Sequence, residues 1–318
     1  RIPDPRRIAE GDPAHSDRLA VNAVLAAGAI LLAGAALLEI RRGGRTASVA
    51  DRELRGRLTN PAVKPGETHV CPCRKGTQQA ALDDQWPFLR GPTLSGRASS
   101  TNGPVTWNGE RGENIAWKVA LTRAGSSSPV VWGKRIFLTA GDASSRSVMA
   151  HDAETGALLW STDIPDGAKA GEALPEAGEE TGLAASSPAC DETRVYAVFA
   201  TGDLVALDHD GKIVWKIFLG RPKNTYGYAS SLVYCGEMLF VQWDQEENGK
   251  VLALDKSTGK TLWETPRGAG SSWSSPVIMP QCDKKLLLIH AKQLTCGFEL
   301  ATGKKLWQVE AVDGEIAP

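Results

Sequence analysis

The sequence predicts an all-β protein, a β-propeller of four-stranded blades, preceded by one transmembrane helix. Three observations lead to this prediction. A glycine is followed four residues later by a tryptophan at four places, a serine pair stands upstream of each of them, and residues 19–38 form an uncharged, mostly apolar run. Hydrophobic residues make up 42% of the 318 residues, so most of the chain is expected to fold.

The glycine–tryptophan repeat occurs in DAETGALLW, DHDGKIVW, DKSTGKTLW and ELATGKKLW, each after a short apolar run. We expect the glycine in a hairpin turn at positive φ, where an Asp or Thr side chain caps backbone N–H groups. The tryptophan then falls on the next strand, from which its ring packs between neighbouring blades. The structural repeat residues are Gly156, Trp160, Gly211, Trp215, Gly259, Trp263, Gly303 and Trp307.

The serine pairs are Ser127-Ser128, Ser186-Ser187, Ser230-Ser231 and Ser274-Ser275, and successive pairs are 59, 44 and 44 residues apart. A period near 44 with several short strands is typical of a four-stranded propeller blade. Turns between the first two strands of a unit are expected at Gly133 and Gly236. Four units and a lead-in strand at residues 114–121 are visible, so we expect at least four blades of a larger ring; a four-bladed ring is the alternative.

Residues 19–40 predict the transmembrane helix, because about 20 apolar residues in a helix span the roughly 30 Å of a bilayer core. The alternatives are a buried Ala-rich helix and a signal-peptide core. Residues 1–18 are then an N-terminal polar segment, residues 41–84 a linker or stalk, and residues 85–318 the propeller, incomplete at its C-terminus. Arginines flank the span on both sides and leave its orientation open.

The pattern A-x-D-x-x-T-G-x-x-x-W resembles the PQQ-like (quinoprotein-type) propeller repeat. That repeat occurs in quinoprotein alcohol dehydrogenases and in the lipoprotein propeller of the outer-membrane-protein assembly machine. The stretch DQWPFLRGPTLSGRAS at residues 84–99 is similar to the opening segment of propellers from planctomycete-type bacteria. The resemblance implies a seven- or eight-bladed ring and, for this single-pass membrane protein, a propeller on the periplasmic side; it says little about activity.

Catalytic chemistry is not expected. The resemblance implies two adjacent cysteines, an Asp base and calcium for a quinoprotein dehydrogenase, but no Cys-Cys dipeptide occurs and the repeat Asp residues are assigned to turns. We therefore expect no cofactor, with PQQ as the alternative. His69, Cys71 and Cys73 form the one compact cluster, a weak metal-site candidate beside disulfide, lipid or plain thiol interpretations. A disulfide between Cys282 and Cys296 is a further hypothesis.

Surface recognition is the favoured function. Net charge is −1 with a pI near 6.6, which predicts no nucleic-acid binding. An acidic insertion at residues 166–181, with Glu176, Glu179 and Glu180, is either a docking loop or a mobile loop. Aromatic residues before the serine pairs are either partner anchors or ordinary packing. They are Tyr226, Tyr228 and Trp273.

Together these features predict a non-catalytic interaction scaffold on a membrane, with other membrane or envelope proteins as partners. Residues 19–38 supply the contact with the membrane. The alternatives are a PQQ-dependent oxidoreductase, or a degenerate relative of one, and a propeller that binds glycans or polymers.

Overall fold

The computed structural model describes residues 85–98, 103–179, 181–281, 284–291 and 294–310, and these ranges contain four four-stranded sheets. Each sheet is one propeller-type blade formed by four strands that are consecutive in the sequence. Blade 1 contains β1 (Val130–Trp132), β2 (Arg135–Gly141), β3 (Arg146–Asp152) and β4 (Leu158–Asp163), and blade 2 contains β5 (Ala189–Cys190), β6 (Arg194–Val198), β7 (Asp203–Asp208) and β8 (Ile213–Phe218). Blade 3 contains β9 (Val233–Cys235), β10 (Met238–Trp243), β11 (Lys250–Asp255) and β12 (Thr261–Pro266), and blade 4 contains β13 (Val277–Gln281), β14 (Lys284–Ala291), β15 (Leu294–Glu299) and β16 (Lys305–Glu310).

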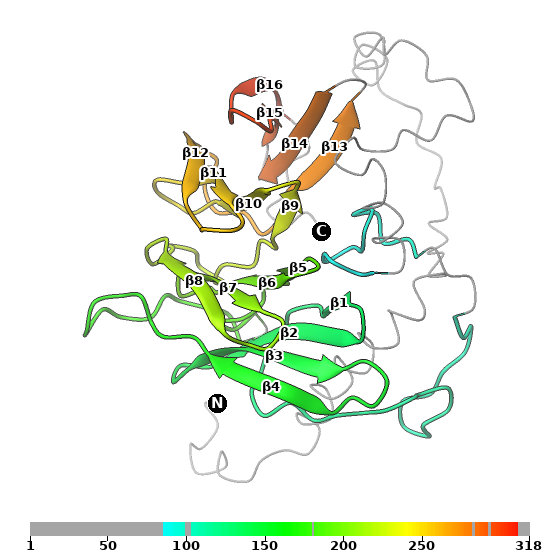
Figure 1. The fold of residues 1–318 in the computed structure, drawn as a ribbon. Coiled ribbons are helices and arrows are strands. Elements are labelled where there is room, and N and C mark those ends of the chain that lie inside the picture. Colours follow the sequence, from blue (N-terminus) through cyan, green and yellow to red (C-terminus); the bar gives the residue numbers. More distant parts are fainter. Residues whose placement is uncertain (1–84, 99–102, 180, 282–283, 292–293, 311–318) are drawn as a thin grey trace, which may run out of the picture.

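The four blades follow one another as an arc in which β1, β5, β9 and β13 lie on the inner side and β4, β8, β12 and β16 on the outer side (Figure 1). All strand pairs within a blade are antiparallel. The predicted turns are confirmed, because Gly133 and Gly236 connect the first two strands of their blades at φ of 59° and 58°.

Burial follows the position of a strand in its blade. The second and third strands of blades 1 to 3 are buried along almost their whole length, which fits their continuous apolar sequence. The outer strands β4 and β12 alternate between exposed and half-buried residues, as expected where one edge faces solvent. The core therefore consists of the inner three strands of blades 1 to 3, the middle strands of blade 4 and the junctions between blades.

The same irregularity occurs in all four blades. The pairing of the third and fourth strands shifts by one residue beside the tryptophan, for example between Ala150 and His151 in blade 1. A bulge of this kind changes the direction in which the side chains of the bulged strand point. It leaves each repeat tryptophan paired with a small residue on the third strand: Ala150, Ala206, Ala253 and Gly297.

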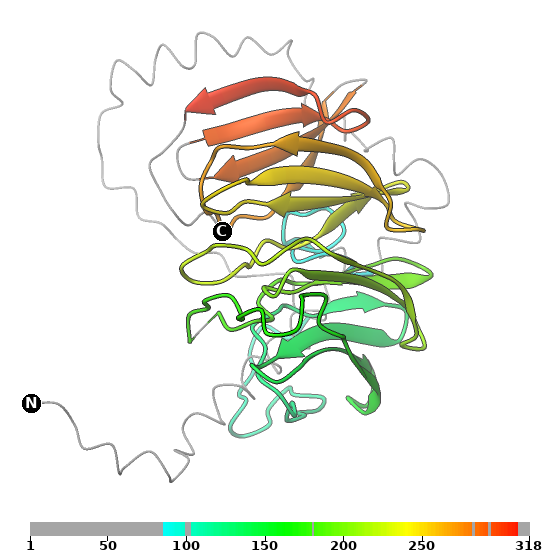
Figure 2. The ribbon, with the colours of Figure 1, turned by 90° about the vertical axis from the view of Figure 1, so that its left-hand side faces the viewer.

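The up-and-down order of the strands gives each blade two different ends. The turns that join the first to the second and the third to the fourth strand share one end, which we call the turn rim. The hairpins between the second and third strands and the connections between blades share the other end, the loop rim. Figure 2 shows the longer connections together on one side of the blades. The acidic insertion belongs to the loop rim.

The opening segment of the propeller crosses the inner edge of the arc. Trp86 pairs with Val131 of β1 through two backbone hydrogen bonds, and the carbonyl of Pro87 accepts a bond from the N–H of Cys190 in β5. The ring of Phe88 is buried against Tyr234 of β9, with centroids 4.8 Å apart. One short segment thus connects the first strands of three blades (Figure 1).

The prediction of a lead-in strand at residues 114–121 is wrong, because that segment forms no regular strand in the structure. Within the described ranges no helix is long and apolar enough to cross a membrane. The predicted span at residues 19–40, the polar segment before it and the stalk lie outside the described residues. They stay predictions, as does the total number of blades.

Candidate functional site

The repeat tryptophans connect each blade to the next. The ring of Trp160 in blade 1 lies over Gly211 in the turn of blade 2, where a Cβ added to the glycine would be 2.6 Å from the ring. The indole Nε1 donates to the carbonyl of His209, at 2.8 Å. Trp215 lies over Gly259 in the same way, and Trp263 lies over Gly303. The predicted wedge between neighbouring blades is confirmed, and all four repeat glycines have positive φ.

Two tryptophans at the ends of the arc lie outside this blade-to-blade series. Trp117, outside the four repeats, lies over Gly156 of blade 1 and donates to the carbonyl of Ala153 at 3.1 Å, so it acts like a further member of the series. Sequence reasoning missed it because the preceding turn glycine, Gly112, stands five residues before it and not the four of the repeat. Trp307 lies instead over Gly297 of its own blade, which is the strand partner of Trp307.

The repeat carboxylates cap the turns. The Asp152 Oδ1 atom accepts bonds from the Thr155 hydroxyl and from the backbone N–H groups of Glu154 and Thr155. These bonds, the one from the Thr155 hydroxyl first, hold the pKa of Asp152 below its usual value. Asp255 is capped and shifted in the same direction, chiefly by the Ser257 and Thr258 hydroxyls. The predicted capping role is confirmed.

The serine pairs form a chain of hydrogen bonds between blades. The backbone N–H of Ser128 donates to the hydroxyl of Ser187, at 2.9 Å. The N–H of Ser187 donates to the hydroxyl of Ser231, and that of Ser231 to the hydroxyl of Ser275. The second serine of each pair therefore connects one blade to the next at the start of the inner strand, which explains its recurrence without nucleophilic chemistry.

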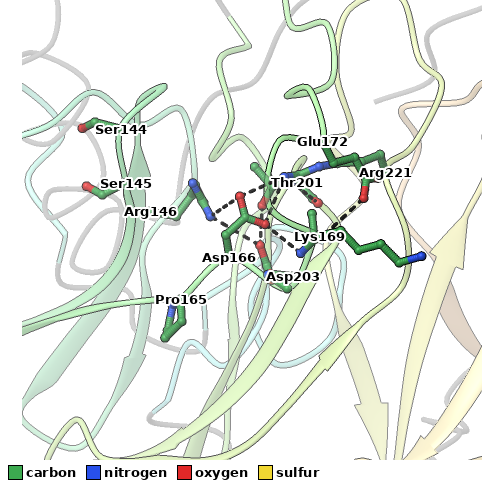
Figure 3. Close-up of polar contacts among 12 residues, drawn as sticks. Ser144, Ser145, Arg146, Pro165, Asp166, Lys169, Glu172, Thr201, Asp203 and Arg221 are labelled. Carbon is green, nitrogen blue, oxygen red and sulfur yellow. Dashed lines mark hydrogen bonds and ion pairs between the residues drawn. The ribbon is translucent and has the colours of Figure 1, made fainter.

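A charged network at the loop rim holds the start of the acidic insertion (Figure 3). Asp166 accepts two bonds from the Arg221 guanidinium, at 2.8 and 3.0 Å, and pairs with Arg146 at 3.2 Å. Asp203, fully buried at the start of β7, accepts bonds from the N–H of Gly167 and the hydroxyl of Thr201, both at 2.8 Å. The network joins blade 1, blade 2 and the insertion.

Three cations and two carboxylates make up this network. Arg146 also lies 3.6 Å from Asp203, and the Lys216 ammonium lies 3.8 Å from the other oxygen of that carboxylate. Burial raises the pKa of Asp166, but the bonds from Arg221 and the N–H of Ala168, with the nearby positive charges, outweigh it and leave the pKa lowered. The Arg146–Asp203 pair is buried, and breaking such a pair by removing one partner typically costs about 3–5 kcal/mol. Asp166 is 38% exposed, so solvent weakens its pairs. The insertion is thus fixed at Asp166 and Gly167.

The far end of the insertion lies against one of the predicted aromatic residues. The N–H of Gly178 donates to the carbonyl of Tyr226, at 3.2 Å, and Ala177 packs beside Gly227. Glu176 and Glu179 are exposed on this part of the loop, while Glu180 lies outside the described residues. Two features that sequence reasoning treated separately, the acidic loop and the aromatic residues, are therefore neighbours in space.

The three predicted aromatic residues have different environments. Tyr226 is 52% exposed, and its ring lies 5.6 Å from that of half-buried Trp273. The Trp273 indole donates to the carbonyl of Gly227, at 2.8 Å. Tyr228 is fully buried against Trp243 and donates its hydroxyl to the Gln242 carbonyl, so its assignment as an exposed anchor is wrong. The Tyr228 side chain therefore lies in the core and not at the surface.

The remaining chemical candidates do not form a site in the described residues. There, no three His, Cys, Asp or Glu side chains gather closely enough to hold a metal ion. His69, Cys71 and Cys73 lie outside the described ranges. Cys296 is a buried free thiol, which contradicts the disulfide hypothesised with Cys282.

Comparison with known proteins gives one family. The family described as outer membrane protein assembly factor BamB matches residues 77–233 and 225–318 of the chain. A polyvinylalcohol dehydrogenase from Pseudomonas sp. is 27% identical over an alignment of 240 residues, which covers 61% of this chain and 35% of that protein. The chain therefore spans about a third of the length of this curated relative.

Solved structures resemble the chain more distantly. BamB from Moraxella catarrhalis is 16% identical with a TM-score of 0.44, covering 64% of this chain and 57% of that one. The quinohemoprotein alcohol dehydrogenase ADHIIG from Pseudomonas putida HK5 is 18% identical with a TM-score of 0.45, covering 62% and 35%. At these values the likeness says nothing about activity.

Proposed function

The chain belongs to the family of the outer membrane protein assembly factor BamB, and from this premise we propose that it is a non-catalytic propeller that binds other envelope proteins. Residues 19–38 tether it to a membrane, with the propeller on the periplasmic side. The partner binds at the loop rim, on the acidic insertion of residues 166–181 and the neighbouring Tyr226.

The observation that carries this proposal is the attachment of the insertion at both ends. Asp166 and Gly167 are held by the buried network of blades 1 and 2, and Gly178 is bonded to the carbonyl of Tyr226. A loop fixed in this way presents its exposed side chains in one arrangement, so little conformational entropy is lost when a partner binds. The repeat does not require the insertion, and long ordered loops on rigid scaffolds commonly carry binding function.

The test is co-purification from detergent extracts of the native membrane. One variant replaces residues 168–179 by Gly-Ser-Gly, which keeps Asp166 and Gly167 in place. The matched control shortens the exposed turn at residues 109–112, which lies outside the insertion. We expect a partner to be retained by the wild type and by the control, and lost from the loop variant. Equal retention by all three proteins would contradict the proposal.

A second candidate function is quinone-dependent oxidation, favoured by the match to a polyvinylalcohol dehydrogenase. The residues do not fit it well: the sequence has no adjacent cysteine pair, and within the described ranges no carboxylate cluster suits calcium. We therefore derive no chemical step through a quinone. Dye reduction by the purified protein with added PQQ, calcium and polyvinyl alcohol would favour this candidate, whereas a rate equal to that of buffer would count against it.

A further inference from the structure

An exposed aromatic pair lies at the centre of the candidate interaction surface. The rings of Tyr226 and Trp273 come from different blade connections, with centroids 5.6 Å apart and planes inclined at 52°. The Trp273 indole is held by its bond to the carbonyl of Gly227, so the pair is fixed by the backbone beneath it. Tyr226 is 52% exposed, which is unusual for so large a side chain packed against a tryptophan.

Carboxylates flank this pair on two sides. On one side, the bond between Gly178 and the Tyr226 carbonyl brings the loop that carries Glu176 and Glu179. On the other side, the Thr225 hydroxyl lies 3.5 Å from Glu246, whose neighbour Glu247 is also exposed. The first segment belongs to the connection between blades 1 and 2, and the second is the hairpin between β10 and β11 of blade 3. Both contact the connection that carries Tyr226.

Few positive charges oppose these carboxylates. Lys223 is the cation nearest in sequence to Tyr226, and its ammonium pairs with Glu247 at 3.0 Å. Within residues 168–179 the one cation is Lys169, against three glutamates. The hairpin at residues 244–249 exposes two carboxylates, Glu246 and Glu247, and no cation, while its Asp244 is buried and paired with Arg267. The surface around the aromatic pair therefore carries a negative potential that attracts positively charged groups.

Resting on the proposed function, we infer that Tyr226 and Trp273 bind a lysine or arginine side chain from a basic segment of the partner protein. A cation over an aromatic face gains about 0.5–2 kcal/mol, depending on its exposure. The carboxylates on both sides attract such a segment and orient it over the rings. An uncharged sugar could stack on the rings and donate hydroxyl hydrogen bonds to the carboxylates, but it would gain no long-range attraction from their charge. The charge pattern therefore favours a basic peptide over a glycan.

The test uses the full chain in detergent and a labelled peptide of alternating glycine and lysine, with binding followed by fluorescence anisotropy. A peptide with glutamate in place of lysine is the control ligand. Tyr226→Phe keeps the ring and should bind like the wild type. Tyr226→Leu keeps apolar bulk but removes the π face, and should weaken binding about three- to tenfold. Circular dichroism checks that each variant is folded.

The charge requirement is tested separately. The double variant Glu176→Gln and Glu179→Gln should weaken binding and reduce its dependence on salt. Glu192→Gln, an exposed carboxylate at the turn rim, is the matched control and should change neither. Equal affinities for wild type and Tyr226→Leu would overturn the inference, as would equal effects of the Glu192 and Glu176/Glu179 changes. If the protein binds a neutral oligosaccharide such as maltohexaose, loses this binding in Tyr226→Leu and does not bind the peptide, the surface is a glycan-binding surface and the inference is wrong.

Failure of this inference is distinguishable from failure of the proposed function. If the peptide does not bind but the loop replacement still releases an envelope partner, the scaffold proposal stands and the cation inference is wrong. If peptide binding follows Tyr226 but the loop replacement leaves the retained partners unchanged, the surface binds cations and the proposed function is wrong.

Discussion

The junction between blades predicts a specific cost for adding one methyl group. Gly211 has a φ of 86°, and a Cβ there would lie 2.6 Å from the Trp160 ring and 3.0 Å from the Thr162 hydroxyl. In Gly211→Ala, the positive φ costs about 1–2 kcal/mol. Overpacking against the ring adds about 1–3 kcal/mol, because the indole must move and strain its bond to His209.

The chain offers a matched control in Gly236. Its φ is 58°, but a Cβ there would meet nothing within 4 Å. Gly236→Ala therefore has the backbone cost alone, about 1–2 kcal/mol. The two variants should differ in free energy of unfolding by about 1–3 kcal/mol, which corresponds to a difference of roughly 2–12 °C in Tm for a domain of this size.

The assay is urea and thermal unfolding followed by circular dichroism. A double-mutant cycle with Trp160→Leu isolates the junction, because the smaller side chain should remove the extra cost of Gly211→Ala. Equal destabilisation by Gly211→Ala and Gly236→Ala would refute the reasoning. So would an extra cost that persists in the Trp160→Leu background, since the ring would then not be its source.

Three further predictions follow from other contacts. Ser187→Ala removes the acceptor of the Ser128 N–H, and it should lower the free energy of unfolding in urea titrations by about 1–3 kcal/mol. A loss below about 0.5 kcal/mol would contradict the role of the serine chain. Phe88→Ala should cost about 3–5 kcal/mol in the same assay, because this buried ring packs on Tyr234; a near-neutral change would place the opening segment outside the core. The pKa of Asp166 is lower in the folded protein than in the unfolded chain, so its ion pairs stabilise the folded loop at pH values above the unfolded-state pKa. This stabilisation is lost as the pH falls through the folded-state pKa. Hydrogen exchange of the bonded Gly167 and Ala168 N–H groups, corrected for its intrinsic pH dependence, should stay slow at neutral pH and accelerate only below about pH 4. In Asp166→Asn it should be fast at neutral pH, and identical profiles for the two proteins would contradict the anchoring.

The blades could be predicted from the sequence because their signals are local and repeated. A turn glycine, a capping Asp and a tryptophan recur at fixed spacing, and each is required by the geometry of its own hairpin or by the next blade. Trp117 has the same contact as Trp160, yet it escaped prediction because its preceding turn glycine, Gly112, is five residues away and not the four of the repeat. A periodic search finds the turn and strand of one unit but not a contact made by a segment of irregular backbone.

The candidate site was only partly predictable. Tyr226 and Tyr228 are two residues apart and look alike in sequence, but they lie in a loop, where no strand alternation tells which ring is exposed. The charged network was missed for a related reason. Arg146 and Asp203 read as ordinary polar residues near turns, and only the folded chain shows that they are buried together. The acidic insertion could be identified because it lengthens one period.

The chain of serine bonds bears on how such a protein can change in evolution. Ser187 and Ser231 each give a hydrogen bond to the following unit and receive one from the unit before. A unit that is duplicated or deleted whole therefore leaves every remaining donor facing an equivalent acceptor. Gain or loss of a complete unit therefore leaves the number of these hydrogen bonds matched. Insertion of a partial unit would leave one backbone N–H group without its serine acceptor. This difference favours evolutionary change by whole units.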